Sequence, residues 1–145
     1  MIKYLSIPLL LISTFGFSAE LFQSATSQNT RIDSTIFYKT INVSKAHKII
    51  EQNSTNSRFI IIDVRAEKDY NQGHIQNAIN IDFKSSDFKS RLDCLDKNKT
   101  YMVICYAGVR SHNTMELMEK LNFTKVYSIK GGMMKWRGKK LPVMN

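Results

Sequence analysis

The chain has 145 residues, a length that suits one domain. Its composition, 43% hydrophobic and 23% charged, excludes a disordered or fibrous protein. The formal net charge of +9 comes from 21 Lys and Arg against 12 Asp and Glu, and the basic residues are spread along the chain, so we expect no dedicated nucleic-acid motif and no nucleic-acid partner. A mildly basic surface of this kind is well solvated and favours encounter with small anions.

Residues 1–18 have the pattern of a secretory signal peptide. A short basic start precedes a mostly apolar run from Leu5 to Phe17, which is shorter than the about 20 residues that a membrane span needs. The small residues Gly16 and Ser18 fit a cleavage site, with cleavage after Ser18. We therefore expect export, to the bacterial periplasm, of a mature form that does not span the membrane. An uncleaved N-terminal anchor is the alternative.

After this segment, residues 19–35 are rich in Ser, Thr, Gln and Asn, which is typical of a flexible linker, and one domain is expected over residues 36–145. Five segments within it predict strands: Ile36 to Lys39, Arg58 to Val64, Ala78 to Ile81, Tyr101 to Ile104 and Phe123 to Tyr127. Helical patterns separate them: one capped by Ser44, one over Ser86 to Leu92, one opening at Ser111, and a last short one holding Met133, Met134 and Trp136. This alternation predicts a three-layer α/β domain with a mostly parallel five-stranded sheet flanked by helices.

The expected strand from Tyr101 to Ile104 leads into Cys105 and a tight loop. It is nearly all apolar, as a strand buried on both faces is. A loop between a central strand and a helix start directs backbone N–H groups at one spot, where they stabilise an anion. Gly108 lets the loop turn inward, and Arg110 adds positive charge. Together these features favour Cys105 as a thiolate nucleophile over an inert buried cysteine.

The remaining candidate ligands are few. The expected strand between Cys94 and Cys105 places the two cysteines at opposite ends of the sheet, farther apart than the about 7 Å between Cα atoms that a disulfide tolerates. We therefore predict no internal disulfide and a structural role for Cys94, with a resolving role as the alternative. Three scattered histidines, without a Cys-x-x-Cys pair, predict no zinc site: His47, His74 and His112. His47 and His112 are expected at the surface.

The run from Cys105 to Ser111, CYAGVRS, resembles the active-site loop of the rhodanese family of sulfurtransferases, which commonly reads C-x-x-G-x-R-S. Further blocks resemble the family in the same order and spacing, over roughly Ile36 to Val143: IDVR at 62–65, YNQGHI at 70–75, AINI at 78–81, and Gly131-Gly132 followed by Trp136. The resemblance is to single-domain, exported enzymes of the thiosulfate sulfurtransferase type.

The resemblance implies that Cys105 takes sulfane sulfur from a small anionic donor such as thiosulfate and passes it to cyanide or a thiol through a persulfide. It implies no metal and no organic cofactor. The substrate would be held by the loop, namely by Tyr106, Ala107, Gly108, Val109 and Arg110. Supporting roles around the loop are implied for Asp63, Arg65, His74 and Ser111.

Two other functions remain open. A non-catalytic sulfur-carrier or partner-binding module would keep the same loop without efficient turnover. A phosphatase-like or arsenate-reductase-like enzyme would use the same cysteine-to-arginine arrangement on a larger oxyanion. The resemblance disfavours the second, because Cys105 to Arg110 spans six residues, and a shorter ring of N–H donors has less room for a tetrahedral phosphate.

Overall fold

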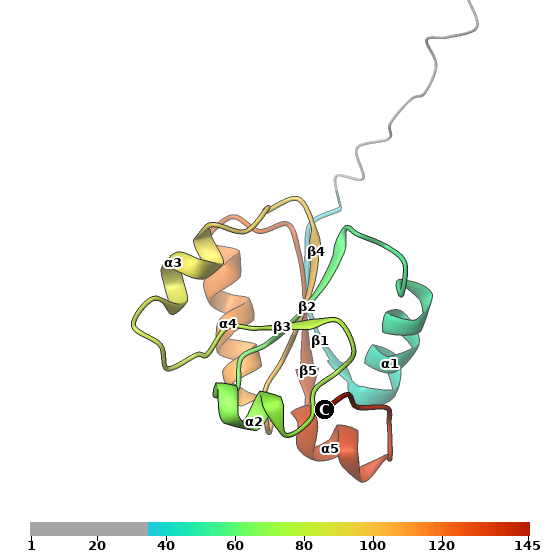
Figure 1. Cartoon of the computed structure of the whole chain (residues 1–145). Coiled ribbons are helices and arrows are strands. Elements are labelled where there is room, and N and C mark those ends of the chain that lie inside the picture. Colours follow the sequence, from blue (N-terminus) through green and yellow to red (C-terminus); the bar gives the residue numbers. More distant parts are fainter. Residues whose placement is uncertain (1–34) are drawn as a thin grey trace, which may run out of the picture. The chain divides into compact units, whose positions relative to one another are not determined.

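The computed structural model describes residues 35–145, so the expected signal peptide and nearly all of the expected linker lie outside the described residues (Figure 1). Five strands form one sheet in which every neighbouring pair is parallel, in the order β1-β5-β4-β2-β3. The predicted parallel sheet is confirmed. The strands are β1 Phe37–Asn42, β2 Phe59–Asp63, β3 Ala78–Asn80, β4 Thr100–Ile104 and β5 Lys125–Lys130.

Helices cover both faces of this sheet, which confirms the three layers. Figure 1 shows α3 and α4 on one side and α1 on the other, with α5 packed below α1. The helices are α1 Val43–Gln52, α2 Glu67–Asn71, α3 Phe88–Asp93, α4 Val109–Lys120 and α5 Gly132–Gly138. Within residues 35–145, none of them is both long and apolar enough to cross a bilayer.

The core consists of two apolar clusters, one on each face of the sheet. Strand β4 contributes to both because successive side chains of a strand point to opposite faces. Tyr101 and Val103 pack with α3 and α4, whereas Met102 and Ile104 pack with α1 and α5. Cys105 continues the alternation and belongs to the cluster under α3 and α4. The nucleophile predicted from the sequence therefore sits at the carboxyl end of the central strand, under helix α4.

Several element boundaries differ from those expected. Helix α4 begins at Val109, two residues before Ser111, and α1 is capped by Asn42 rather than Ser44, because the Asn42 side chain accepts a hydrogen bond from Lys45 N at 2.9 Å. Strand β5 starts at Lys125. Phe123 precedes it, with its ring packed edge-on against Tyr101 at 5.2 Å between centroids.

The last helix differs from expectation at one residue. Met133 and Trp136 are buried, as predicted for residues that pack the helix on the core, but Met134 is exposed. Since all five strands are parallel, their carboxyl ends meet at one edge of the sheet, which is where α/β proteins place their sites. Asp63 at the end of β2 and Cys105 after β4 lie at this edge.

Candidate active site

Cys105 is almost completely buried, at 1% exposure, and its sulfur contacts the loop that follows it. The Gly108 N–H donates to Cys105 Sγ at 3.1 Å. Gly108 caps α4 with φ 102°, a left-handed conformation that favours glycine and turns its N–H back to the sulfur. The loop geometry therefore provides a backbone donor to a sulfur anion at this position.

The start of α4 adds further positive character next to this sulfur. The first N–H groups of any helix lack an intrahelical acceptor, and they carry the positive end of the helix dipole. In α4 these residues include Val109 and Arg110, immediately after Gly108. One backbone N–H of the expected anion-binding loop is thus bonded to the sulfur, and the amides of the first helical turn are available for the charged end of a donor.

Arg110 and the loop residues lie where a ligand can reach them. Arg110 is half-buried, and its guanidinium has no hydrogen-bond or ion-pair partner within residues 35–145. Tyr106, Ala107 and Val109 are exposed, with Tyr106 at 56% and Val109 at 68%. A buried sulfur beneath an exposed loop that also carries an uncompensated cation suits reaction with a small anion.

Helix α5 holds the loop from its other side. The Met133 N–H donates to Cys105 O at 2.8 Å, and the Met134 N–H donates to Tyr106 O at 2.9 Å. Gly108 in turn lies against Gly131, because a Cβ on Gly108 would come within 2.8 Å of Gly131 N. The Gly131-Gly132 pair noted in the sequence therefore works by close backbone approach to the Cys105 loop.

Two buried serines lie behind the sulfur. Ser111 Oγ is 3.7 Å from Cys105 Sγ and donates to Gly108 O at 2.9 Å, while Ser128 Oγ donates to Ser111 Oγ at 3.2 Å. Ser111 was predicted as a supporting residue. Ser128, on β5, was not predicted. The other buried residues of β5 are apolar, so a serine among them is a signal that could have pointed to it.

Asp63 and Arg65 form a buried ion pair that braces a neighbouring loop. Arg65 Nη2 is 2.6 Å from Asp63 Oδ2, and it also donates to Gly73 O at 2.9 Å. Asn80 donates from Nδ2 to the carbonyl oxygens of both residues, each at 2.9 Å. The pair therefore ties β2, β3 and the loop at Gly73 together.

His74 lies in the braced loop and makes no contact with Cys105 that the structure records. Its ring stacks on Tyr70 with centroids 3.8 Å apart, and its Nδ1 is 3.1 Å from Tyr70 O. Its backbone pairs with Met144 in both directions at 2.8 Å. Arg137, which sequence reasoning missed, donates to Gly73 O at 3.2 Å. His74 thus fixes the loop and the C-terminal tail.

The other histidines and the second cysteine lie elsewhere. His112 is half exposed on α4 and contacts Glu116, whereas His47, expected at the surface, is partly buried on α1. Cys94 and Cys105 are both free, as predicted. Cys94 is exposed, however, so the structural role expected for it is not supported. Within residues 35–145, no three His, Cys, Asp or Glu side chains are grouped as metal ligands would be.

Comparison with known proteins places this geometry in a family. A family model described as rhodanese-like domain matches residues 42–139. The chain is 33% identical over 103 residues to the thiosulfate sulfurtransferase GlpE of Actinobacillus pleuropneumoniae serotype 3, covering 71% of this chain and 90% of that protein. It is 33% identical over 92 residues to the putative sulfurtransferase YtwF of Bacillus subtilis, covering 63% of this chain and 86% of that protein.

Solved structures agree with this placement. A rhodanese-related protein from Thermoplasma volcanium superposes with a TM-score of 0.60 at 29% identity, covering 74% of this chain and 98% of that one. The rhodanese-like domain of the Anabaena Alr3790 protein, at 23% identity, has a TM-score of 0.63, covers 73% of this chain and 78% of that one, and shares the fold. The family model spans the region that holds Cys105 and its loop, and the chain belongs to the rhodanese-like domain family.

Proposed function

We propose that this protein is a sulfurtransferase that carries sulfane sulfur as a persulfide on Cys105, with thiosulfate as a donor and cyanide or a thiol as the acceptor. Relatives named as sulfurtransferases support the reaction class. The observation that carries the proposal is the 3.1 Å contact between Gly108 N and Cys105 Sγ at the start of α4. Such a donor stabilises a sulfur anion.

The reaction has two balanced steps. In the first, the Cys105 thiolate attacks the outer sulfur of thiosulfate; a new S–S bond forms, the original S–S bond breaks, and its electron pair leaves with sulfite. In the second, the acceptor attacks the outer sulfur of the persulfide, and the electron pair of the broken bond returns to Cys105 as thiolate. This is covalent catalysis with ping-pong kinetics, and it uses no external oxidant or reductant.

The loop has a defined part in each step. The Gly108 N–H donates to Cys105 Sγ, and the first N–H groups of α4 provide donors close by for the charged sulfonate end of the donor. Arg110, whose guanidinium is not engaged by residues 35–145, supplies the counter-charge. Both steps start from an anionic nucleophile or release an anion, so the loop has to stabilise negative charge, and no general base is assigned.

The test is cyanide-dependent release of thiocyanate from thiosulfate, with the intact mass recorded after addition of thiosulfate alone. We expect the wild type to gain about 32 Da and to turn over, and Cys105→Ser to do neither. Cys94→Ser is the matched control, because Cys94 is the other free cysteine and is exposed. It should behave as the wild type.

Other outcomes select other functions. A mass gain on Cys105 without turnover would show that the protein is a sulfur-carrier module and not an enzyme of this kind. If fully reduced wild-type protein shows no mass gain and no turnover, thiosulfate is ruled out as the donor. If Cys94→Ser loses both the mass gain and turnover, the persulfide is not carried by Cys105 alone.

We also propose that the mature protein is exported to the bacterial periplasm, on the basis of the basic start and short apolar run in residues 1–18. Cell fractionation with intact-mass measurement of the recovered protein tests this. Cleavage after Ser18 and release with the periplasmic fraction are expected. A full-length form in the membrane fraction would establish a retained anchor.

A further inference from the structure

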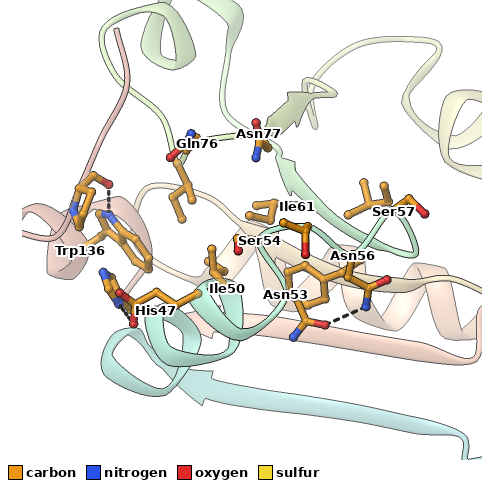
Figure 2. Close-up of a pocket in the computed structure, with 16 residues that line it drawn as sticks. His47, Ile50, Asn53, Ser54, Asn56, Ser57, Ile61, Gln76, Asn77 and Trp136 are labelled. Carbon is orange, nitrogen blue, oxygen red and sulfur yellow. Dashed lines mark hydrogen bonds and ion pairs between the residues drawn. The ribbon is translucent and has the colours of Figure 1, made fainter.

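A cavity of about 520 Å³ lies beside α1, away from the Cys105 loop (Figure 2). Its core-facing residues Ile61, Ile75 and Trp136 belong to the cluster under α1 and α5, whereas Cys105 belongs to the cluster on the opposite face of the sheet. No residue from 105–111 lines it. The volume falls within the range of about 300–1,000 Å³ that small-molecule sites occupy.

The inner wall of this cavity is apolar and held in place. Ile50 of α1 and Ile61 of β2 line it together with Ile75 and Trp136. The Trp136 indole N–H donates to Pro142 O at 2.9 Å, so the polar atom of the ring is already satisfied and the ring is fixed. Trp136 is only 1% exposed, so its ring backs the wall, and a ligand would meet chiefly the half-buried Ile50 and Phe59.

The rim of the cavity carries some carboxamide side chains that are already hydrogen-bonded within the protein and others that are not. Figure 2 shows Gln76 and Asn77 on the side of the cavity opposite Ile50 and Asn53. Asn53 Nδ2 donates to a backbone carbonyl at 2.8 Å and its Oδ1 accepts from Asn56 at 2.9 Å, so it is engaged. The side chains of Gln76 and Asn77 are exposed and have no protein partner within residues 35–145. They can donate to and accept from a bound molecule.

The charge of the lining is the selective feature. Among residues 35–145, no Lys or Arg lines the cavity, although the chain has a net charge of +9. The ionisable groups that do line it, His47 and Glu51, are paired with each other at 3.1 Å. An anion such as the sulfur donor would leave solvent here without a counter-ion, which costs free energy. The lining therefore favours uncharged molecules.

We propose that this cavity is a binding site for a neutral small molecule with a flat apolar body and an amide, amine or hydroxyl group at its edge. The body would lie against Ile50 and Phe59, which cover the buried Ile61 and Trp136, and the edge group would bond to Gln76 or Asn77. The site stands independently of the proposed sulfur transfer, because it shares no residue with the Cys105 loop.

The test uses two dyes with the same ring skeleton. N-phenyl-1-naphthylamine is neutral and has one N–H; 1-anilinonaphthalene-8-sulfonate adds a sulfonate. Trp136 is the single tryptophan of the chain, so energy transfer from tryptophan to dye reports binding of the dye to the protein, and the variants below test whether it binds at this wall. With the mature protein we expect one neutral dye per chain, saturable energy transfer, and at least tenfold weaker binding of the sulfonate.

A preference for the neutral dye would distinguish binding in the cavity from unspecific binding, because unspecific attraction to a chain of net charge +9 would favour the sulfonate. Equal or tighter binding of the sulfonate would overturn the proposal, as would neutral-dye binding without saturation or without energy transfer from Trp136.

A matched pair of variants places the dye. Ile50 and Ile49 are adjacent, half-buried residues of α1, but only Ile50 lines the cavity. Ile50→Lys should weaken the neutral dye at least tenfold and reduce its preference over the sulfonate, while Ile49→Lys should keep the preference. If circular dichroism shows that either variant fails to fold, Gln76→Lys at the exposed rim takes its place, with a loss of at least threefold expected. Unchanged affinity in the folded cavity variant would contradict the site.

Discussion

Gly132 lies directly against the backbone carbonyl of Cys105. A Cβ on Gly132 would stand 2.3 Å from Cys105 O and 2.5 Å from Tyr106 O, and neither atom can rotate away as a side chain can. Gly132 also has φ 52°, in the left-handed region. The next residue, Met133, donates its N–H to the same Cys105 carbonyl. The position of Cys105 thus depends on the absence of a side chain at Gly132, 27 residues later in the chain.

Gly132→Ala should therefore displace the Cys105 loop. We expect at least a tenfold loss of thiocyanate formation and a decrease of about 2 kcal/mol in the free energy of unfolding, measured by urea titration, because overpacking against fixed backbone costs about this much. Gly138→Ala is the control in the same helix, since nothing lies within 4 Å of its added Cβ. Equal effects of the two substitutions would show that the close approach is unimportant.

Arg65→Met should strongly destabilise the domain. Asp63 has no solvent exposure, and loss of the guanidinium would leave its carboxylate buried without a counter-charge, at a cost of about 3–5 kcal/mol in the free energy of unfolding. The exposed pair of Lys97 with Asp93 gives the comparison. Lys97→Met should cost less than about 1 kcal/mol in the same urea titration. A small cost for Arg65→Met would mean that the buried pair does not brace the fold.

Ser111→Ala should impair sulfur transfer more than stability. The hydroxyl lies 3.7 Å from Cys105 Sγ and can turn to donate to a sulfur anion, so its loss should lower kcat about tenfold and move the pH-rate profile to higher pH. Ser90→Ala removes a hydroxyl that bonds to Asp87 O at 2.8 Å, on a different helix, and should leave the profile in place. A uniform loss at all pH values in Ser111→Ala would indicate a purely structural role.

Tyr101 should make the domain sensitive to strong base. Burial, with a smaller effect of Asp96, raises the pKa of Tyr101 to about 12. A tyrosine in the unfolded chain titrates near pH 10, so above about pH 10 the unfolded chain loses a proton that the folded chain keeps. The stabilisation is complete below about pH 10 and is lost as the pH rises toward about 12, by up to about 1.4 kcal/mol per pH unit.

The unfolding free energy at about pH 9 and about pH 11, compared between wild type and Tyr101→Phe, measures this effect. The variant should lose about 1 kcal/mol at the lower pH, because it lacks the hydroxyl that donates to Asp96 O at 2.8 Å, and should show a smaller decrease between the two pH values. The same decrease in both proteins would exclude Tyr101 as the titrating group.

Much of the site could be predicted because its parts are close together in the sequence. The strand, the turn at Gly108 and the helix start after it follow one another between residues 100 and 111, so the apolar run and the glycine alone predict where the Gly108 N–H can meet Cys105. The helix start was misplaced by two residues, because the left-handed Gly108 begins α4 before the apolar pattern of that helix becomes visible.

Contacts between residues far apart in the sequence could not be predicted in this way. Ser128 reaches Ser111 only because β5 lies next to β4, and His47, expected on the surface, is enclosed because α5 brings Trp136 beside α1. By itself the sequence determined the fold class and the strand, turn and helix start around Cys105, since hydrophobic periodicity and turn residues act over a few neighbouring positions. Packing between distant segments decided the contact between Gly132 and Cys105 and the cavity beside α1, because both depend on backbone and side-chain shapes that meet only in the folded chain.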